Sequence, residues 1–431
     1  MNTDPDKSGA RNIVRSAIAK IITVVLAAFC MPALLVLSAM IPKENIRDNM
    51  LRSAEYLYGS ELFGDVIEGI DGSRIDRYAD SILLNIAYHY DNDHPIRSVM
   101  LSAYYFTPYH EENENLLIAV RDDMGMNRQY LRYWHGSIAV IRPILTLMPI
   151  NGIYILNGAV ILALIALYIY VFAKDGDYAA PVALLISLII TRSFYVPFSC
   201  EYAPTYILML VSSCIAVILY KNGQSAWLNP LFFITGMATS FADFLTTETL
   251  TLLVPLISIT WLMRKDSKGS AELTRRTVIL TILWACGYVV MWASKWLLCS
   301  VIFSENAMQY VTEHVSERLG GYLGLNMWQY ITGAVTKNIG CLFPLGYGAV
   351  GGIIFIGLII FAAYRGYVYN RGSVNGNFVA TLVVMAIIPY IRYIVLHNHS
   401  YIHYFFTYRA QAATVMAIVL IVWAITEKKD G

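Results

Sequence analysis

Long apolar runs separated by polar segments recur along this chain of 431 residues and constrain its fold more than any other feature. Most are close to the roughly 20 residues that an α-helix needs to cross the hydrocarbon core of a bilayer. The runs cover residues 21–41, 152–173, 179–198, 202–220, 228–243, 245–263, 277–303, 344–368, 377–396 and 409–426. Only 14% of the residues are charged, against about 25% in soluble domains. This pattern predicts an all-α integral membrane protein with about ten transmembrane helices.

The first apolar run follows a polar and basic segment, residues 1–20, so a signal peptide is the alternative interpretation. The apolar core of a signal peptide is typically about 7–15 residues long, and the run 21–41 is longer. We therefore interpret this run as an uncleaved first transmembrane helix whose N-terminus lies in the cytoplasm.

Lys and Arg residues are distributed unequally between the two sides of the predicted bundle. With the N-terminus inside, the inner segments hold 15 of the 31 Lys and Arg residues, namely Lys7, Arg11, Arg15, Lys20, Lys174, Lys221, Arg264, Lys265, Lys268, Arg275, Arg276, Arg365, Arg371, Lys428 and Lys429. Short cytoplasmic loops carry such an excess, whereas long loops translocate largely regardless of charge. The bias predicts a multi-pass protein of the cell (plasma) membrane with both termini cytoplasmic.

This topology divides the chain into six parts. A cytoplasmic N-terminus (1–20) and a first transmembrane helix (21–41) precede a large, mostly helical extracytoplasmic loop (42–150) and a transmembrane bundle (151–303). A second extracytoplasmic loop (304–343) and C-terminal transmembrane helices with a cytoplasmic tail (344–431) complete the chain. Within the second loop, apolar residues of 305–319 recur at the spacing of a helix that lies on the membrane face.

Ionisable residues crowd the predicted outer side. All eight histidines fall there, as do residues at span ends, namely Arg192, Glu201, Asp243, Glu248, Lys295, Arg392 and Arg409. Charges in a membrane are costly and often functional, so this distribution predicts a site on the outer face. The net charge of +1 gives no basic face for nucleic acid. The six cysteines form no CxxC pair and indicate neither a zinc site nor a disulfide framework.

Two carboxylates stand four residues apart in the first loop, at Asp76 and Asp80. On a helix covering 75–88 this spacing places both on one face. Such a pair can serve as a base with an orienting group, or as a seat for a divalent metal. A solvated helix face beside Arg77 is the alternative.

Further candidates lie near the second span, between the third and fourth spans, and between the fifth and sixth spans. Tyr133, Trp134 and His135, followed by Arg142, fit either an interfacial aromatic belt with a snorkelling arginine or an edge that faces a sugar and a phosphate. Glu201 and Asp243 lie at outer turns and are candidates for substrate binding. Helix capping is the alternative for the Asp243 turn.

The densest polar and aromatic run contains His397, His399, Tyr401 and His403, between Arg392 and Arg409. The histidine spacing does not match H-E-x-x-H, which puts two ligands on one helix face. We therefore assign no metal ligand and leave a divalent metal cofactor open. An interfacial belt is the alternative, but three histidines with two arginines favour a site for an anionic headgroup.

The layout of a first span, a long outer loop with an acidic pair, many spans and a second large outer loop resembles that of the GT-C glycosyltransferases. That resemblance implies transfer of a sugar from a polyprenyl-phosphate donor on the outer membrane face. It also implies that a first-loop carboxylate activates the acceptor, which falls on Asp76 or Asp80. The adjacent Asp-Asp or Asp-Glu of some branches is absent from this position.

These observations lead to one expected function and two alternatives. We expect a membrane glycosyltransferase that uses a polyprenyl-phosphate sugar donor, an envelope glycan, lipid or protein acceptor, and surrounding membrane lipids. In that mechanism Arg392 or Arg409 stabilises the leaving phosphate and Asp80 or Asp76 takes the acceptor's proton. The alternatives are a transporter or flippase of a lipid-linked glycan and a non-catalytic partner in polysaccharide assembly.

Overall fold

The computed structural model describes residues 5–243, 245–266, 270–303, 324–343 and 376–427, together with a few residues between 356 and 364. Within these ranges the regular elements are α-helices and 3₁₀-helices, and two isolated β-bridges join Asp65 to Arg74 and Tyr104 to Arg128. The described part of the chain is therefore all-helical, as the apolar runs predict.

Six helical segments of the described chain are long and apolar enough to cross a membrane: Val14–Ala39, Ile150–Ala173, Tyr202–Lys221, Ala271–Phe303, Gly376–Val395 and Tyr404–Thr426. They belong to α1 (Pro5–Ala39), α7 (Ile150–Ala173), α9 (Tyr202–Lys221), α12 (Ser270–Phe303), α16 (Gly376–Val395) and α18 to α19 (Tyr404–Thr407 and Ala412–Thr426), with a 3₁₀-turn between the last two. A helix suits these runs because it satisfies every backbone polar group within its own segment, which hydrocarbon requires.

Three other predicted spans form shorter helices, α8 (Ala179–Ile190), α10 (Leu228–Ala242) and α11 (Leu250–Asp266). The run 344–368 and the helix predicted over 305–319 fall largely or wholly outside the described residues. The structure thus supports a multi-pass helical bundle, and the count of ten spans stays a prediction.

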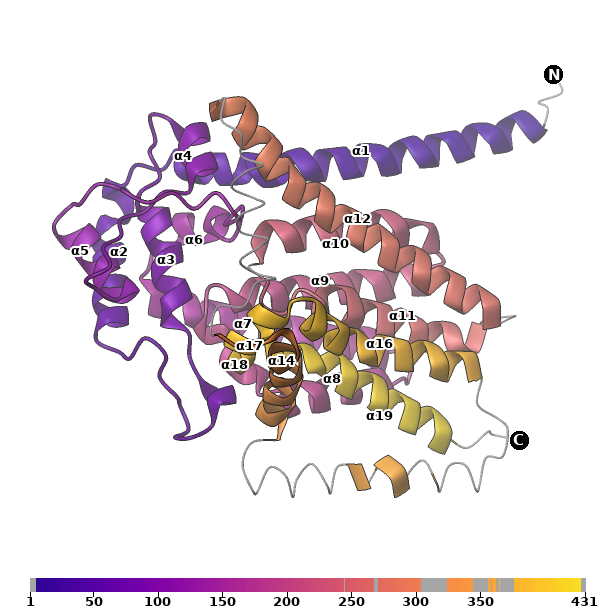
Figure 1. Cartoon of the computed structure of the whole chain (residues 1–431). Coiled ribbons are helices and arrows are strands. Elements are labelled where there is room, and N and C mark those ends of the chain that lie inside the picture. Colours follow the sequence, from indigo (N-terminus) through magenta and orange to yellow (C-terminus); the bar gives the residue numbers. More distant parts are fainter. Residues whose placement is uncertain are drawn as a thin grey trace.

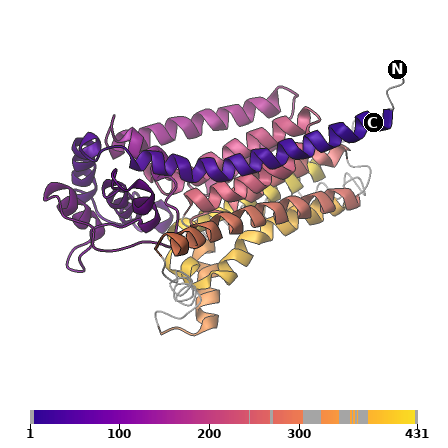
Figure 2. The ribbon, with the colours of Figure 1, turned by 90° about the horizontal axis from the view of Figure 1, so that it is seen from above.

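The first loop forms a helical domain at one end of the bundle (Figures 1 and 2). It contains α2 (Glu44–Tyr58), α3 (Arg77–Tyr88), α4 (Pro95–Leu101), α5 (Glu112–Arg121) and α6 (Ile138–Ile144). Its apolar side chains, such as Met50, Leu84 and Leu116, belong to one buried cluster with Leu35 of α1 and Met291 of α12. The domain is therefore continuous with the bundle core rather than tethered to it.

The opposite end of the bundle holds the start of α1 and the end of α19 (Figure 1). Several cations that the charge bias assigns to the inner side pair there: Lys221 lies 2.6 Å from Asp175, and Arg264 lies 3.4 Å from Glu427. The two ends of the described chain therefore lie on one side of the bundle, and the first-loop domain lies on the other.

Candidate functional site

A cavity of about 280 Å³ lies where the first-loop domain meets the bundle. Four parts of the chain line it: α3, the segment from Tyr104 to His135, the turn before α9, and the helices α17 (His397–Ile402) and α18. Its lining side chains are Asp76, Tyr78, Ala79, Ile82, Leu83, Tyr104, Arg128, Gln129, Tyr130, Arg132, Tyr133, His135, Glu201, His399, His403 and Phe406. Segments more than 300 residues apart in sequence thus share one polar and aromatic space.

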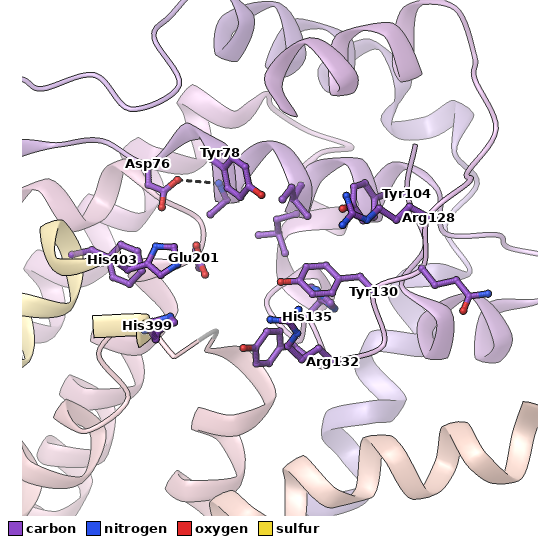
Figure 3. Close-up of a pocket in the computed structure, with 16 residues that line it drawn as sticks. Asp76, Tyr78, Tyr104, Arg128, Tyr130, Arg132, His135, Glu201, His399 and His403 are labelled. Carbon is purple, nitrogen blue, oxygen red and sulfur yellow. Dashed lines mark hydrogen bonds between the residues drawn. The ribbon is translucent and has the colours of Figure 1, made fainter. Parts of the chain in front are cut away.

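Figure 3 shows that the charged groups of this cavity are separated into two ends. Asp76, Glu201, His399 and His403 gather at what we call the acidic end. Tyr104, Arg128, Tyr130, Arg132 and His135 lie toward the other, which we call the basic end. A ligand with one anionic group and several hydroxyls suits such a division.

Asp76 occupies the N-cap of α3, one residue outside the helix. Its Oδ1 accepts a hydrogen bond from the Ala79 N–H at 3.0 Å, and its Oδ2 accepts one from the Tyr202 hydroxyl at 2.7 Å. Burial raises the pKa of this carboxyl above its ordinary value. The carboxylate therefore reaches the cavity as a stronger base than an exposed aspartate.

Asp80 lies on another side of α3, away from the cavity and against the bundle. Its carboxylate accepts hydrogen bonds from the Tyr154 hydroxyl at 2.6 Å, the Cys200 N–H at 2.9 Å and the Ser199 hydroxyl at 3.2 Å. Burial raises its pKa to about 7. Both carboxylates therefore contact the turn from Ser199 to Tyr202, and only Asp76 lines the cavity.

The basic end is built on the segment from Arg128 to His135, which begins at a β-bridge and turns at Leu131 and Arg132. Backbone hydrogen bonds of 2.9 and 3.0 Å pair Tyr104 with Arg128. The guanidinium of Arg132 lies 5.6 Å from the ring centre of Tyr130 and 5.8 Å from that of Tyr133. Aromatic faces and guanidinium groups therefore alternate along this wall.

His135 ends this segment in a left-handed backbone conformation, with φ of +55°. A left-handed non-glycine residue is uncommon and is often held at a functional site. Gly136 follows it and donates its N–H to the Phe241 carbonyl at 2.8 Å; a Cβ at Gly136 would lie 2.2 Å from the Phe241 ring. Burial lowers the pKa of His135 well below its ordinary value, so the ring is neutral near pH 7.

His399 and His403 come from α17 and the residue after it, and their ring centres are 4.6 Å apart. The His403 ring also stacks on Phe406, with 5.2 Å between centres. Two of the three predicted histidines of this run therefore line the cavity. His397 lies outside the lining, with its Nδ1 3.2 Å from the Ile394 carbonyl.

Other sequence-predicted site residues lie behind the cavity wall and hold the fold together. Trp134 donates its indole N–H to the Met291 carbonyl at 2.8 Å. Arg142 donates to the carbonyls of Ser38 and Ala39 at 3.0 and 2.8 Å, where α1 ends. Both side chains are buried, so they occupy neither the interfacial belt nor the ligand-facing edge that the sequence suggests.

Asp243 and Tyr401 also lie outside the cavity lining. Asp243 accepts hydrogen bonds from the Thr205 hydroxyl at 2.7 Å and from the N–H of Thr246, which secures the turn between α10 and α11. The Tyr401 ring packs edge-on against Tyr330 of α14 (Met327–Leu342), with 5.3 Å between ring centres.

The two arginines predicted to bind phosphate are buried as well. Arg392 forms an ion pair with Glu248, 2.8 Å from Nε to Oε1. Arg409 donates from Nη2 to the Gly72 carbonyl of the first loop at 3.1 Å and lies 5.9 Å from the Tyr202 ring centre. Among the described residues, Nε and Nη1 of Arg409 have no hydrogen-bond acceptor.

Several cavity residues were not predicted from the sequence, chiefly Tyr78, Tyr104, Arg128, Tyr130, Arg132 and Phe406. One local signal was present, because Arg128 and Tyr130 are two residues apart, and in an extended segment such residues point to one face. Tyr78 and Phe406 carried no such signal. Their places depend on how the first-loop domain and the α17–α18 region come together around the cavity.

Within the described residues, no group of three or more His, Cys, Asp or Glu side chains lies close enough together to hold a metal ion. No protein-family model, curated protein or solved structure matches this chain.

Proposed function

We propose that this protein is a membrane glycosyltransferase that moves a sugar from a polyprenyl-phosphate donor to a hydroxyl of an envelope glycan, lipid or protein on the outer face of the membrane. The division of the cavity into an acidic and a basic end carries this proposal. Glycosyl transfer needs both, since one end must accept a proton while the other stabilises a departing phosphate.

In this proposal the donor phosphate binds at the basic end, beside Arg128 and Arg132. The planar guanidinium group suits paired hydrogen bonds to phosphate oxygens. The rings of Tyr130 and Tyr133 offer apolar faces to the sugar. Arg392, which the sequence alone suggests for this role, is already paired with Glu248, and Arg409 is not among the residues that line the cavity.

The acceptor hydroxyl enters at the acidic end and attacks the anomeric carbon of the donor sugar. The bond from that carbon to the phosphate oxygen breaks, and its electron pair leaves with the polyprenyl phosphate. The hydroxyl proton passes to the Asp76 carboxylate, while Glu201 binds sugar hydroxyls. General-base catalysis of this kind contributes roughly 10²- to 10⁴-fold to a rate.

The position of the cavity supports an enzyme over a transporter or flippase. Its lining comes from the first-loop domain, the turn before α9 and the α17–α18 region, all at one end of the bundle. A transporter with alternating access binds its substrate near the bilayer midplane and opens to both sides.

Transfer in lipid nanodiscs tests the proposal directly. The purified protein is incubated with polyprenyl phosphates carrying different hexoses and with lipid or glycan acceptors, and products are followed by mass spectrometry. We expect at least one donor to be consumed with release of polyprenyl phosphate. If no donor is consumed and polyprenyl phosphate does not raise the melting temperature, the proposal is wrong.

A second experiment tests the outer location of the site. Tyr109, in the first loop, is 89% exposed. In a variant lacking the native cysteines, Tyr109→Cys should react with an impermeant maleimide in intact cells, and Glu272→Cys at the other end of the bundle should react only after permeabilisation. The reverse pattern would place the cavity on the cytoplasmic side.

A further inference from the structure

A buried ion pair lies directly behind the acidic end of the cavity. Arg392 of α16 and Glu248, just before α11, are 7% and 6% exposed. Arg392 donates from Nε to Oε1 of Glu248 at 2.8 Å and from Nη2 to Oε2 at 3.3 Å. This two-point contact fixes the plane of the guanidinium group.

The same guanidinium joins two further segments. Its Nη1 donates to the Ser400 hydroxyl of α17 at 2.9 Å, and its Nη2 donates to the Leu245 carbonyl. Leu245 has a left-handed backbone with φ of +63°, a conformation that non-glycine residues seldom adopt. The carbonyl that accepts from Arg392 thus belongs to a residue with an unfavourable backbone conformation, which the surrounding structure must stabilise.

The fourth partner of this guanidinium belongs to the cavity wall. Nη2 of Arg392 lies 3.4 Å from Nδ1 of His399, whose ring lines the acidic end. A guanidinium group has only donors, so Nδ1 of His399 is the acceptor in this contact, in which Nη2 shares its two hydrogens among Leu245, Glu248 and His399. A neutral imidazole that accepts at Nδ1 carries its proton on Nε2.

From this geometry we infer that Glu248 and Arg392 are positioning residues that hold His399 as a neutral ring with its proton on Nε2, so that it serves as a hydrogen-bond donor to an oxygen of the bound sugar. The inference rests on the proposed function for the identity of the ligand. It makes His399 a donor rather than a proton acceptor and leaves Asp76 as the base of the acidic end.

Substitutions of His399 separate these two roles. The amide nitrogen of Gln can occupy the place of the imidazole Nε2, whereas Phe offers no donor. We expect His399→Gln to keep transfer within about threefold of wild type, and His399→Phe to lower the rate at least tenfold with little change in the KM for donor. His94→Gln, at an exposed histidine of the first loop, is the matched control. Equal losses in the Gln and Phe variants would overturn the inference.

A double-variant comparison tests whether Arg392 acts through His399. Arg392→Lys should lower the transfer rate several-fold in the wild-type background and cause no further loss in the His399→Phe background. A merely structural role would lower the rate by the same factor in both backgrounds, and that result would overturn the inference.

The tautomer itself can be read by nitrogen-15 NMR of histidine-labelled protein, with the His399 signals assigned by their loss in His399→Gln. We expect the proton on Nε2 in wild type and a changed tautomer or protonation state in Arg392→Met. A proton on Nδ1 in wild type would overturn the positioning role. This readout needs no turnover, so it separates failure of the positioning role from failure of the proposed glycosyl transfer.

Discussion

The wall of the cavity and the layer of protein directly behind it use arginine and aspartate in different ways. In the cavity wall, Arg132 lies across tyrosine rings beside a space large enough for a ligand. One layer deeper, Arg142, Arg392 and Arg409 donate to backbone carbonyls or to a carboxylate. The two layers also divide the acidic pair, because Asp76 lines the cavity and Asp80 lies in the deeper layer.

This difference shows that the depth of a charge in a membrane protein does not by itself mark a binding site. The high cost of a buried cation is offset by carbonyls where helices end, as Arg142 shows at the end of α1. Substitutions in the cavity wall should therefore lower activity at nearly constant stability, and substitutions in the deeper layer should lower stability.

The largest expected effect is on catalysis at Asp76. Asn is as good an N-cap as Asp, so Asp76→Asn keeps the bond to Ala79 while removing the base. We expect the transfer rate to fall by about 10²- to 10⁴-fold with a melting temperature close to that of wild type. A rate within threefold of wild type would place the base elsewhere, and Glu201 would be the next candidate.

The next effect is on stability at the buried ion pair. Arg392→Met leaves the Glu248 carboxylate buried without its cation, which should cost about 3–5 kcal/mol. The combined change Arg392→Met and Glu248→Leu should recover much of that loss, because a hydrophobic replacement of a buried pair is often neutral. Thermal unfolding in detergent measures both variants. A double variant no more stable than Arg392→Met would show that further contacts, such as that to Ser400, dominate.

The pH dependence of stability should report Asp80. Burial raises its pKa to about 7 in the folded chain, above the value near 4 of the unfolded chain. The folded chain then holds the proton more tightly, so the stabilisation is complete below about pH 4 and is lost as the pH rises through 7. The loss amounts to at most about 4 kcal/mol.

Asp80→Asn should lower stability by a constant amount, through its weaker contacts to Cys200, and should flatten the slope between about pH 4 and pH 7. Melting temperatures of the two proteins across this range measure the difference. Parallel curves for wild type and variant would assign the slope to another group, with Asp76 the first to test.

The smallest expected effect is on the affinity for polyprenyl phosphate, and it is tested at one arginine from the cavity wall and one from the deeper layer. Lys replaces the guanidinium fork with a single point charge, so Arg128→Lys should weaken polyprenyl phosphate binding about tenfold, or about 1.4 kcal/mol. Arg409→Lys should change the affinity little, although it should lower the melting temperature without ligand. Titration of polyprenyl phosphate against melting temperature gives both quantities. If Arg409→Lys weakened binding more than Arg128→Lys, the phosphate site would lie at Arg409, as the sequence alone suggests.

The sequence by itself determined the helical class and most helix positions. The run 152–173 becomes α7 and the run 202–220 becomes α9, because composition and helix formation are both local properties. The sequence also indicated a polar site at the end of the bundle near the first loop, and Asp76, Tyr133, His135, Glu201, His399 and His403 do line a cavity there.

Only the tertiary structure decided which charged residues face that cavity and which are buried against protein. Arg392 and Glu248 pair across 144 residues of sequence, and Asp80 meets Cys200 across 120. No local spacing encodes such contacts. Whether Asp80 and Arg392 face the cavity depends on tertiary contacts, those of α3 with Tyr154 and Cys200 and that of α16 with Glu248. Residues of the same type therefore acquire different roles according to how the helices pack.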